Sequence, residues 1–161
     1  MFTLDYASGI AARLTSIIRP YCDAVVVAGS IRRRRPQVKD IDLVVIPNSL
    51  SGLAMALLKR GEILTKKRLD SKTKIIKARF EGVPVDIYLA DKETWATILL
   101  IRTGSADHNK RLAMKAKRLD LHLKANGEGI LDGDGRKISG DTEQSIFAAL
   151  GMEWVPPEKR E

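Results

Sequence analysis

Several residue types are scarce in this sequence, and each shortage excludes a class of protein. One cysteine among 161 residues rules out a disulfide framework and any cysteine-based zinc or iron–sulfur site. Apolar runs stay well short of the roughly 18 residues that a membrane helix needs. The N-terminus has no basic start followed by an apolar stretch, so no secretory signal is predicted. We therefore expect an intracellular, cytoplasmic protein with no membrane partner.

Aromatic residues are also few, at 5%, which argues against a surface that binds single strands mainly by stacking their bases. Positive charge, by contrast, is abundant. The 28 Lys and Arg outnumber the 20 Asp and Glu, for a formal net charge of +8. Nine basic residues fall within 59–79 and six more within 110–124. Such clusters keep a protein soluble, but they also favour polyanionic partners, because each neutralised phosphate releases counterions.

Hydrophobic periodicity and turn residues predict an α+β chain with two lobes, 1–90 and 91–161. Helices are predicted over 7–19, 49–59, 91–101, 105–119 and 141–151. Strands are predicted over 24–28, 40–46, 62–69, 72–80 and 83–89, with a small hairpin in 127–137. Asp91 is the expected cap of the third helix, and Asp141 with Gln144 resembles a capping box for the last one.

Two carboxylates open the predicted strand 40–46. Asp40 and Asp42 are two residues apart, so in a strand they project from the same face, with backbones roughly 6–7 Å apart. Carboxylates held that close repel each other unless a divalent cation lies between them. Oxygen ligands suit Mg²⁺, which commonly binds one or two carboxylates together with substrate phosphates. Alone, the pair is weak support for a metal site, because many strands begin with exposed acidic residues.

Two further features strengthen the metal-site interpretation. Gly29-Ser30 directly follows a predicted strand, where backbone amides and a hydroxyl can cradle phosphate oxygens, and the next arginines offer fork-shaped donors. Asp86 lies inside the apolar strand 83–89. Burying its charge there is costly without a cation or a hydrogen-bond network, although Asp86 could also lie at an exposed strand edge.

These residues resemble the palm of the family X DNA polymerases, the polymerase beta group. The resemblance rests on Gly29-Ser30-x-Arg32-Arg33, then six residues, then Asp40-x-Asp42, followed at a distance by Asp86. Thr103-Gly104-Ser105 with Asn109 and a basic helix is similar to the family's thumb-side nucleotide segment, and the ending from Leu150 to Pro157 is similar to its C-terminal tail. The resemblance implies a nucleotidyltransferase-type palm with a mixed sheet and flanking helices, then a small, mostly helical thumb.

The resemblance also implies roles for individual residues. Asp40 and Asp42 would bridge two Mg²⁺ ions, with Mn²⁺ as an expected substitute, and Asp86 would hold the ion that activates the primer 3′-hydroxyl. The implied nucleotide-binding residues are Gly29, Ser30, Arg33, Lys39, Thr103, Gly104, Ser105 and Asn109. The expected DNA-binding residues are Lys66, Lys67, Lys74, Lys77, Arg79, Lys110, Arg111 and Lys115. The expected partners are nucleoside triphosphates and duplex DNA with a primer terminus or gap, bound by a monomer.

Three departures from the family pattern matter. Ile101-Arg102 stands where polymerase beta has two aromatic residues that screen the sugar, so we expect weak selectivity against ribonucleotides. Ala113 stands where the family's thumb helix has an arginine that checks the minor groove. Only 28 residues precede Gly29, so we expect neither a lyase domain nor fingers.

Two other functions remain open on the sequence. A nucleotidyltransferase acting on a small molecule, an RNA end or an untemplated DNA end shares the Gly-Ser and Asp-x-Asp pattern, but needs neither two basic clusters nor the Thr-Gly-Ser segment. A non-catalytic DNA-binding module could retain the fold, but it would not need all three carboxylates. The favoured hypothesis is a small gap-filling or repair DNA polymerase.

Overall fold

Five strands form a mixed sheet in the N-terminal half of the computed structural model, which describes residues 1–161. In sheet order the strands are β2 (Cys22–Val27), β4 (Ile41–Pro47), β7 (Val83–Leu89), β6 (Ile75–Phe80) and β5 (Gly61–Ile63). β4 and β7 are parallel, and every other neighbouring pair is antiparallel. The α+β class expected from the sequence is confirmed.

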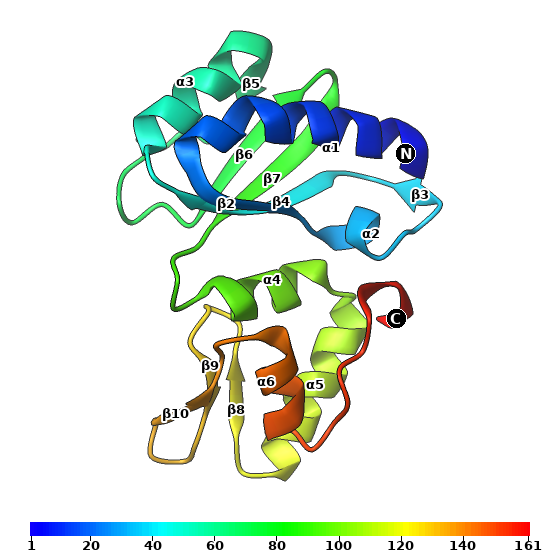
Figure 1. The fold of residues 1–161 in the computed structure, drawn as a ribbon, viewed down its shortest axis with the longest axis vertical. Coiled ribbons are helices and arrows are strands. Elements are labelled where there is room, and N and C mark those ends of the chain that lie inside the picture. Colours follow the sequence, from blue (N-terminus) through cyan, green and yellow to red (C-terminus); the bar gives the residue numbers. More distant parts are fainter.

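Two helices, α1 (Leu4–Ile18) and α3 (Leu50–Arg60), cover one face of this sheet (Figure 1). Their apolar sides meet the inward side chains of β4, among them Ile41, Leu43 and Val45, in a core of 16 buried residues. Successive side chains of a strand point to opposite faces. Asp42 and its even-numbered neighbours on β4 therefore project from the face away from α1.

The helix α4 (Trp95–Thr103) lies on that second face (Figure 1). Leu99 of α4 packs with Ala28 and Val44 in a small buried cluster, which Tyr88 and Ile98 border. The face of the sheet that carries Asp42 is thus directed toward the C-terminal half of the chain.

The C-terminal half has a hydrophobic core of its own, built from seven buried residues that include Leu100, Leu112 and Phe147. It contains α5 (Ala106–Arg118), α6 (Glu143–Ala149) and a sheet of β8 (His122–Lys124), β9 (Gly129–Leu131) and β10 (Lys137–Ser139). The remaining elements are β1 (Phe2–Thr3), paired with β3 (Gln37–Val38), and the short helices α2 (Gly29–Arg32), η1 (Arg19–Tyr21) and η2 (Pro157–Lys159). No helix is long and apolar enough to cross a membrane.

Several predicted elements differ from the structure in their extent or their caps. The strand predicted over 62–69 is only β5, because residues 66–68 are all basic and give the strand no apolar side to bury. The predicted hairpin in 127–137 is wrong in extent, since β8 adds a third strand. The capping box of α6 is formed by Thr142 and Ser145, not by Asp141 and Gln144.

The start of α4 also differs from its prediction. The helix begins at Trp95, and its N-cap residue is Thr94, three residues after the expected cap Asp91. Asp91 instead accepts a hydrogen bond from the backbone N–H of Thr94 at 2.8 Å. The Asp91 side chain therefore orders the turn that leads into the helix.

His108 is a buried histidine of α5 whose ring lies 5.8 Å from the ring of Phe147, centroid to centroid. Burial, followed by the charges of Arg160 and Arg111, lowers the pKa of His108 to about 4. Because this folded-state pKa lies below the unfolded value, the neutral ring contributes stability above about pH 6.5 that is lost as the pH falls toward 4.

Replacing His108 by Leu should therefore make the free energy of unfolding depend less on pH below about pH 6.5. We expect the wild type to lose about 3 kcal/mol relative to His108→Leu between pH 7 and pH 4. Urea unfolding of both proteins across this pH range measures the difference between their free energies of unfolding. The carboxylates contribute equally to both proteins, so their pH dependence drops out of this difference. A difference that does not change with pH would show that the ring is protonated as freely in the folded protein as in the unfolded one.

Candidate active site

Asp42 and Asp86 lie side by side on neighbouring strands. The register of the parallel pair β4–β7 matches Asp42 with Asp86, and in-register residues of adjacent strands point to the same face. Both side chains are partly buried on the face directed toward α4. Asp40 precedes β4 by one residue and is also partly buried.

The other two carboxylates act on the pKa of Asp42. Burial, then the negative charges of Asp40 and Asp86, raise the pKa of Asp42 to about 7, while Tyr88 and Arg102 act in the opposite direction. A divalent cation relieves such repulsion, and the carboxylate oxygens are hard donors suited to Mg²⁺. No three acidic, histidine or cysteine side chains approach closely enough to form a complete ligand set. An ion here would take further ligands from water and substrate, as Mg²⁺ commonly does.

Asp86 is held from two sides. The ammonium of Lys77 donates to its carboxylate oxygens at 3.1 and 3.0 Å. The hydroxyl of Tyr88 lies at 3.5 Å, the long limit of a hydrogen bond. The guanidinium of Arg102, on α4, stacks 4.2 Å from the centroid of the Tyr88 ring. Two cations and a phenol therefore border the acidic centre.

Gly29 lets the turn after β2 approach Asp42 closely. The backbone N–H of Ala28 donates to the carbonyl of Asp42 at 2.8 Å. Gly29 itself has a φ of +58°, and a Cβ at this position would overlap the Asp42 carboxylate. Only glycine combines the left-handed conformation with that contact. Ser30, the next residue, is thereby placed beside the acidic centre at the start of α2.

Replacing Gly29 by Ala should disrupt this arrangement. The methyl group would push α2 and the Asp42 carboxylate apart, and displacements of about 1 Å can cost roughly a hundredfold in rate. We expect any reaction that this site catalyses to slow at least about a hundredfold. Gly133→Ala is the matched control, because nothing lies within 4 Å of its added Cβ. Equal rates for the two variants would mean that the turn has no part in the reaction.

The arginines after Ser30 bring the second predicted segment to this site. Arg33 donates to the carbonyl of Thr103, and Arg32 donates to the Thr103 hydroxyl at 2.7 Å. Gly104 lies against Arg33 and has a φ of +70°, with a cis peptide bond to Ser105. Residues about 70 positions apart in the sequence, which were predicted to bind one nucleotide, are therefore neighbours. Burial, then the charge of Arg35, lowers the pKa of Arg33.

Of the other predicted nucleotide-binding residues, Ser105 and Asn109 make hydrogen bonds within the protein, and Lys39 is at the surface. Ser105 caps α5 by accepting the N–H of His108 at 3.1 Å. Asn109 donates to the carbonyl of Ile101 at 2.8 Å, and its buried amide oxygen has no partner. Lys39 is exposed.

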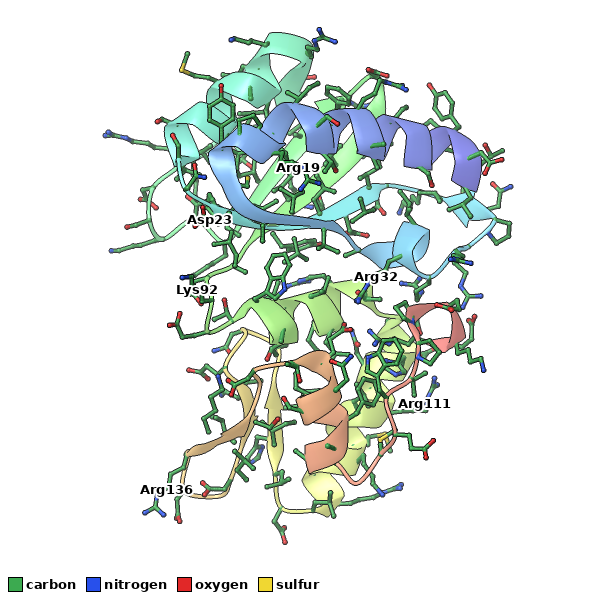
Figure 2. The ribbon with its side chains drawn as sticks, viewed as in Figure 1. Arg19, Asp23, Arg32, Lys92, Arg111 and Arg136 are labelled. Atoms are coloured by element: carbon green, nitrogen blue, oxygen red, sulfur yellow. The ribbon has the colours of Figure 1, made fainter.

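The predicted DNA-binding residues come from both halves of the chain. Lys66 and Lys67 are exposed in the loop after β5. Lys74, Lys77 and Arg79 lie at or on β6, and the ammonium of Lys77 is occupied by Asp86. On α5, Lys110 pairs with Asp107 at 3.3 Å. Arg111 is exposed at the outer side of the same helix (Figure 2), and Lys115 is partly buried.

Sequence reasoning missed an ion network between the two halves. The Glu143 carboxylate accepts from Arg32 at 2.7 and 3.0 Å and from Arg160 at 3.0 and 3.3 Å. Arg32 points from α2 into the space between the halves (Figure 2), and Arg160 is fully buried. Burial opposes the ionisation of Glu143, but the hydrogen bonds from both arginines lower its pKa. Neither charge nor spacing in the sequence indicated that these residues meet.

Comparison with known proteins is consistent with this geometry. Residues 98–161 match the family model for the DNA polymerase beta thumb. Over 163 aligned positions, 99% of this chain is 28% identical to the DNA polymerase/3′-5′ exonuclease PolX of Bacillus subtilis (strain 168). The chain spans 28% of that relative's length.

The mixed sheet with its paired aspartates and the helical lobe that follows form a polymerase beta-like palm and thumb. The chain is similar to the family X polymerases, over residues 98–161 in the family model and over nearly its whole length in the Bacillus subtilis relative, as the resemblance in its sequence predicted.

Proposed function

We propose that this chain is a DNA polymerase that adds nucleotides to a primer 3′-hydroxyl, in gap-filling or repair synthesis. The observation that carries the proposal is the in-register placement of Asp42 and Asp86 beside the Gly29-Ser30 turn. This carboxylate pair would attract divalent cations, and the turn beside it would offer donors to a triphosphate. The thumb match and the relative's name favour DNA as the substrate.

In the proposed reaction, the primer 3′-oxygen forms a bond to the α-phosphorus and the bond to the bridging oxygen breaks, releasing pyrophosphate. Two Mg²⁺ ions, or Mn²⁺ in their place, would neutralise phosphate charge and lower the pKa of the 3′-hydroxyl. Asp40 and Asp42 would hold both ions, and Asp86 the one nearer the primer. Ser30 and Arg33 would orient the β- and γ-phosphates. Phosphoryl transfer needs mainly positioning and charge neutralisation, which these residues supply without a nucleophilic side chain.

Duplex DNA would be held by the basic residues of the loop after β5, of β6 and of α5. Their charges favour primed or gapped duplexes, because counterion release makes each phosphate contact favourable at low salt. The two basic clusters lie on different lobes, so a single copy of the chain could contact DNA on both sides of the acidic centre.

Primer extension on a duplex with a one-nucleotide gap tests this function. We expect Mg²⁺-dependent addition of the nucleotide that pairs with the template, above the other three deoxynucleotides. Equal addition of all four, or addition to an unpaired strand alone, would instead favour an untemplated or small-molecule nucleotidyltransferase. Binding without any addition would favour a non-catalytic DNA-binding module.

Sugar selectivity is a finer prediction. Ile101 and Arg102 are not aromatic, so neither can screen the 2′-hydroxyl with a ring. The Arg102 guanidinium stacks on Tyr88, and the Ile101 carbonyl accepts a hydrogen bond from Asn109. A site that does not clash with an added hydroxyl discriminates by at most about a hundredfold. Single-turnover incorporation should therefore prefer deoxyribonucleotides by no more than about that factor. A preference above about ten-thousandfold would overturn this prediction.

A further inference from the structure

Lys77 is placed to control access to Asp86. On the antiparallel pair β6–β7 it is the register partner of Asp86. Its ammonium lies 3.1 and 3.0 Å from the two oxygens of that carboxylate. No other carboxylate pairs with it. Both oxygens of a proposed metal ligand therefore accept hydrogen bonds from one positively charged side chain.

The ammonium and a divalent cation compete for the same oxygens. A positive charge a few ångströms from an incoming cation repels it and weakens its binding. An ion can bind Asp86 at full strength only when the Lys77 ammonium moves away.

The structure allows the side chain alone to move. The Lys77 carbonyl accepts the N–H groups of Leu64 and Thr65 at 2.8 and 3.2 Å. Its own N–H donates to the Thr65 hydroxyl at 2.8 Å. The Lys77 side chain is 59% exposed, whereas Asp86 is 21% exposed. The backbone is thus fixed, while a flexible four-carbon stem carries the charge at the surface.

An alternative partner for the ammonium must be an anion that arrives with the substrate. Arg79 projects from the same face of β6, two residues along, and is also exposed. Two cations at this spacing on a strand, about 6–7 Å apart, match the separation of successive phosphates on one nucleic-acid strand. On the proposed function the primer would end at Asp86, so its last phosphates would be the anions nearest Lys77.

We propose that Lys77 is a positioning residue that exchanges partners: it pairs with Asp86 in the free protein and with a primer-strand phosphate when DNA binds. The exchange frees Asp86 for a divalent cation only when a primer is present. Primer and metal then bind cooperatively, and linkage requires that each tightens the other by the same factor. This inference rests on the proposed polymerase function.

Mn²⁺ binding, measured by electron paramagnetic resonance with and without a primed duplex, tests the exchange. In the wild type we expect DNA to tighten Mn²⁺ binding on the order of tenfold. In Lys77→Met, Mn²⁺ should bind on the order of tenfold more tightly without DNA, and DNA should add little further. The variant should also reduce the slope of log affinity for DNA against log salt by about 0.9, the effect of one phosphate contact.

Two control variants test whether the effect needs a positive charge at position 77 itself or only a positive charge on this face of β6. Arg79→Met should lower the salt slope in the same way but leave Mn²⁺ binding without DNA unchanged, because Arg79 pairs with no carboxylate. Lys77→Arg should behave nearly as the wild type, since it keeps a mobile cation at the same place.

The failure of this inference can be told apart from failure of the proposed function. Asp86→Asn should weaken Mn²⁺ binding; if it does not, Asp86 is no metal ligand and both proposals fall. If Asp86→Asn weakens binding but Lys77→Met leaves Mn²⁺ affinity and its coupling to DNA unchanged, the exchange is wrong and the polymerase proposal stands.

Discussion

Replacing Asp42 by Asn should reduce nucleotide incorporation by at least about a thousandfold. The substitution keeps the shape of the side chain but removes the charge that lies between Asp40 and Asp86. Electrostatic stabilisation by a preorganised site is commonly the largest contribution to such catalysis, and loss of one group alone costs about a hundred- to a thousandfold. Asp42 would bind two ions, so its replacement should reduce the rate by a factor at or above the upper end of this range. Single-turnover incorporation on a gapped duplex measures the effect.

The same variant should be more stable than the wild type when no metal is present. The folded-state pKa of Asp42 is raised to about 7, so ionising this carboxyl group destabilises the folded protein. The destabilisation is absent at a pH below the ordinary pKa of an aspartate, where the group is protonated in both the folded and the unfolded state. As the pH rises from about 4 to about 7 in a chelating buffer, the wild type should lose up to about 4 kcal/mol that Asp42→Asn retains. Activity and stability thus change in opposite directions, which distinguishes a functional residue from a structural one.

Asp120→Asn is the control for both measurements. Asp120 is exposed and has a φ of +55°, a conformation that asparagine tolerates well. It should leave incorporation and stability nearly unchanged. Incorporation by Asp42→Asn above a tenth of the wild-type rate would contradict the assignment of Asp42 to the reaction.

Replacing Glu143 by Gln should cause the largest loss of stability. Glu143 is 7% exposed and is paired with the fully buried Arg160 and the partly buried Arg32. Removing one member of a buried ion network leaves uncompensated charge and costs about 3–5 kcal/mol. Urea unfolding at neutral pH measures this loss.

A second variant separates charge balance from packing. Glu143→Gln leaves the charge of the buried Arg160 without a carboxylate partner. Adding Arg160→Leu removes that charge, so the double variant should recover part of the stability that the single variant loses. The Arg160 guanidinium also lies 5.4 and 5.7 Å from the ring centroids of Phe147 and Trp154, so some packing is lost and recovery should be partial. A loss below about 1 kcal/mol for Glu143→Gln would show that the network does not hold the two lobes together.

The features that sequence reasoning predicted well are those encoded by local patterns. β7 (Val83–Leu89) has the predicted bounds, because alternation and turn dipeptides act over a few residues.

The contacts that sequence reasoning missed join residues far apart in the chain. Lys77 was expected to bind DNA, but its partner Asp86 depends on the register of β6 against β7. Arg32 and Glu143, 111 positions apart, meet only because α2 and α6 approach each other between the lobes. His108 lies in the first turn of the basic helix α5, yet it is buried beside Phe147 of α6. No local pattern contains this information.

The most direct test of the account is to locate divalent cations in crystals of the protein with gapped DNA, Mn²⁺ and a non-hydrolysable nucleotide. Anomalous scattering should reveal two Mn²⁺ ions, with Asp40 and Asp42 touching both, Asp86 touching one, and Lys77 displaced from Asp86. Ions bound away from these three carboxylates, or a nucleotide that does not reach Ser30 and Arg33, would contradict it.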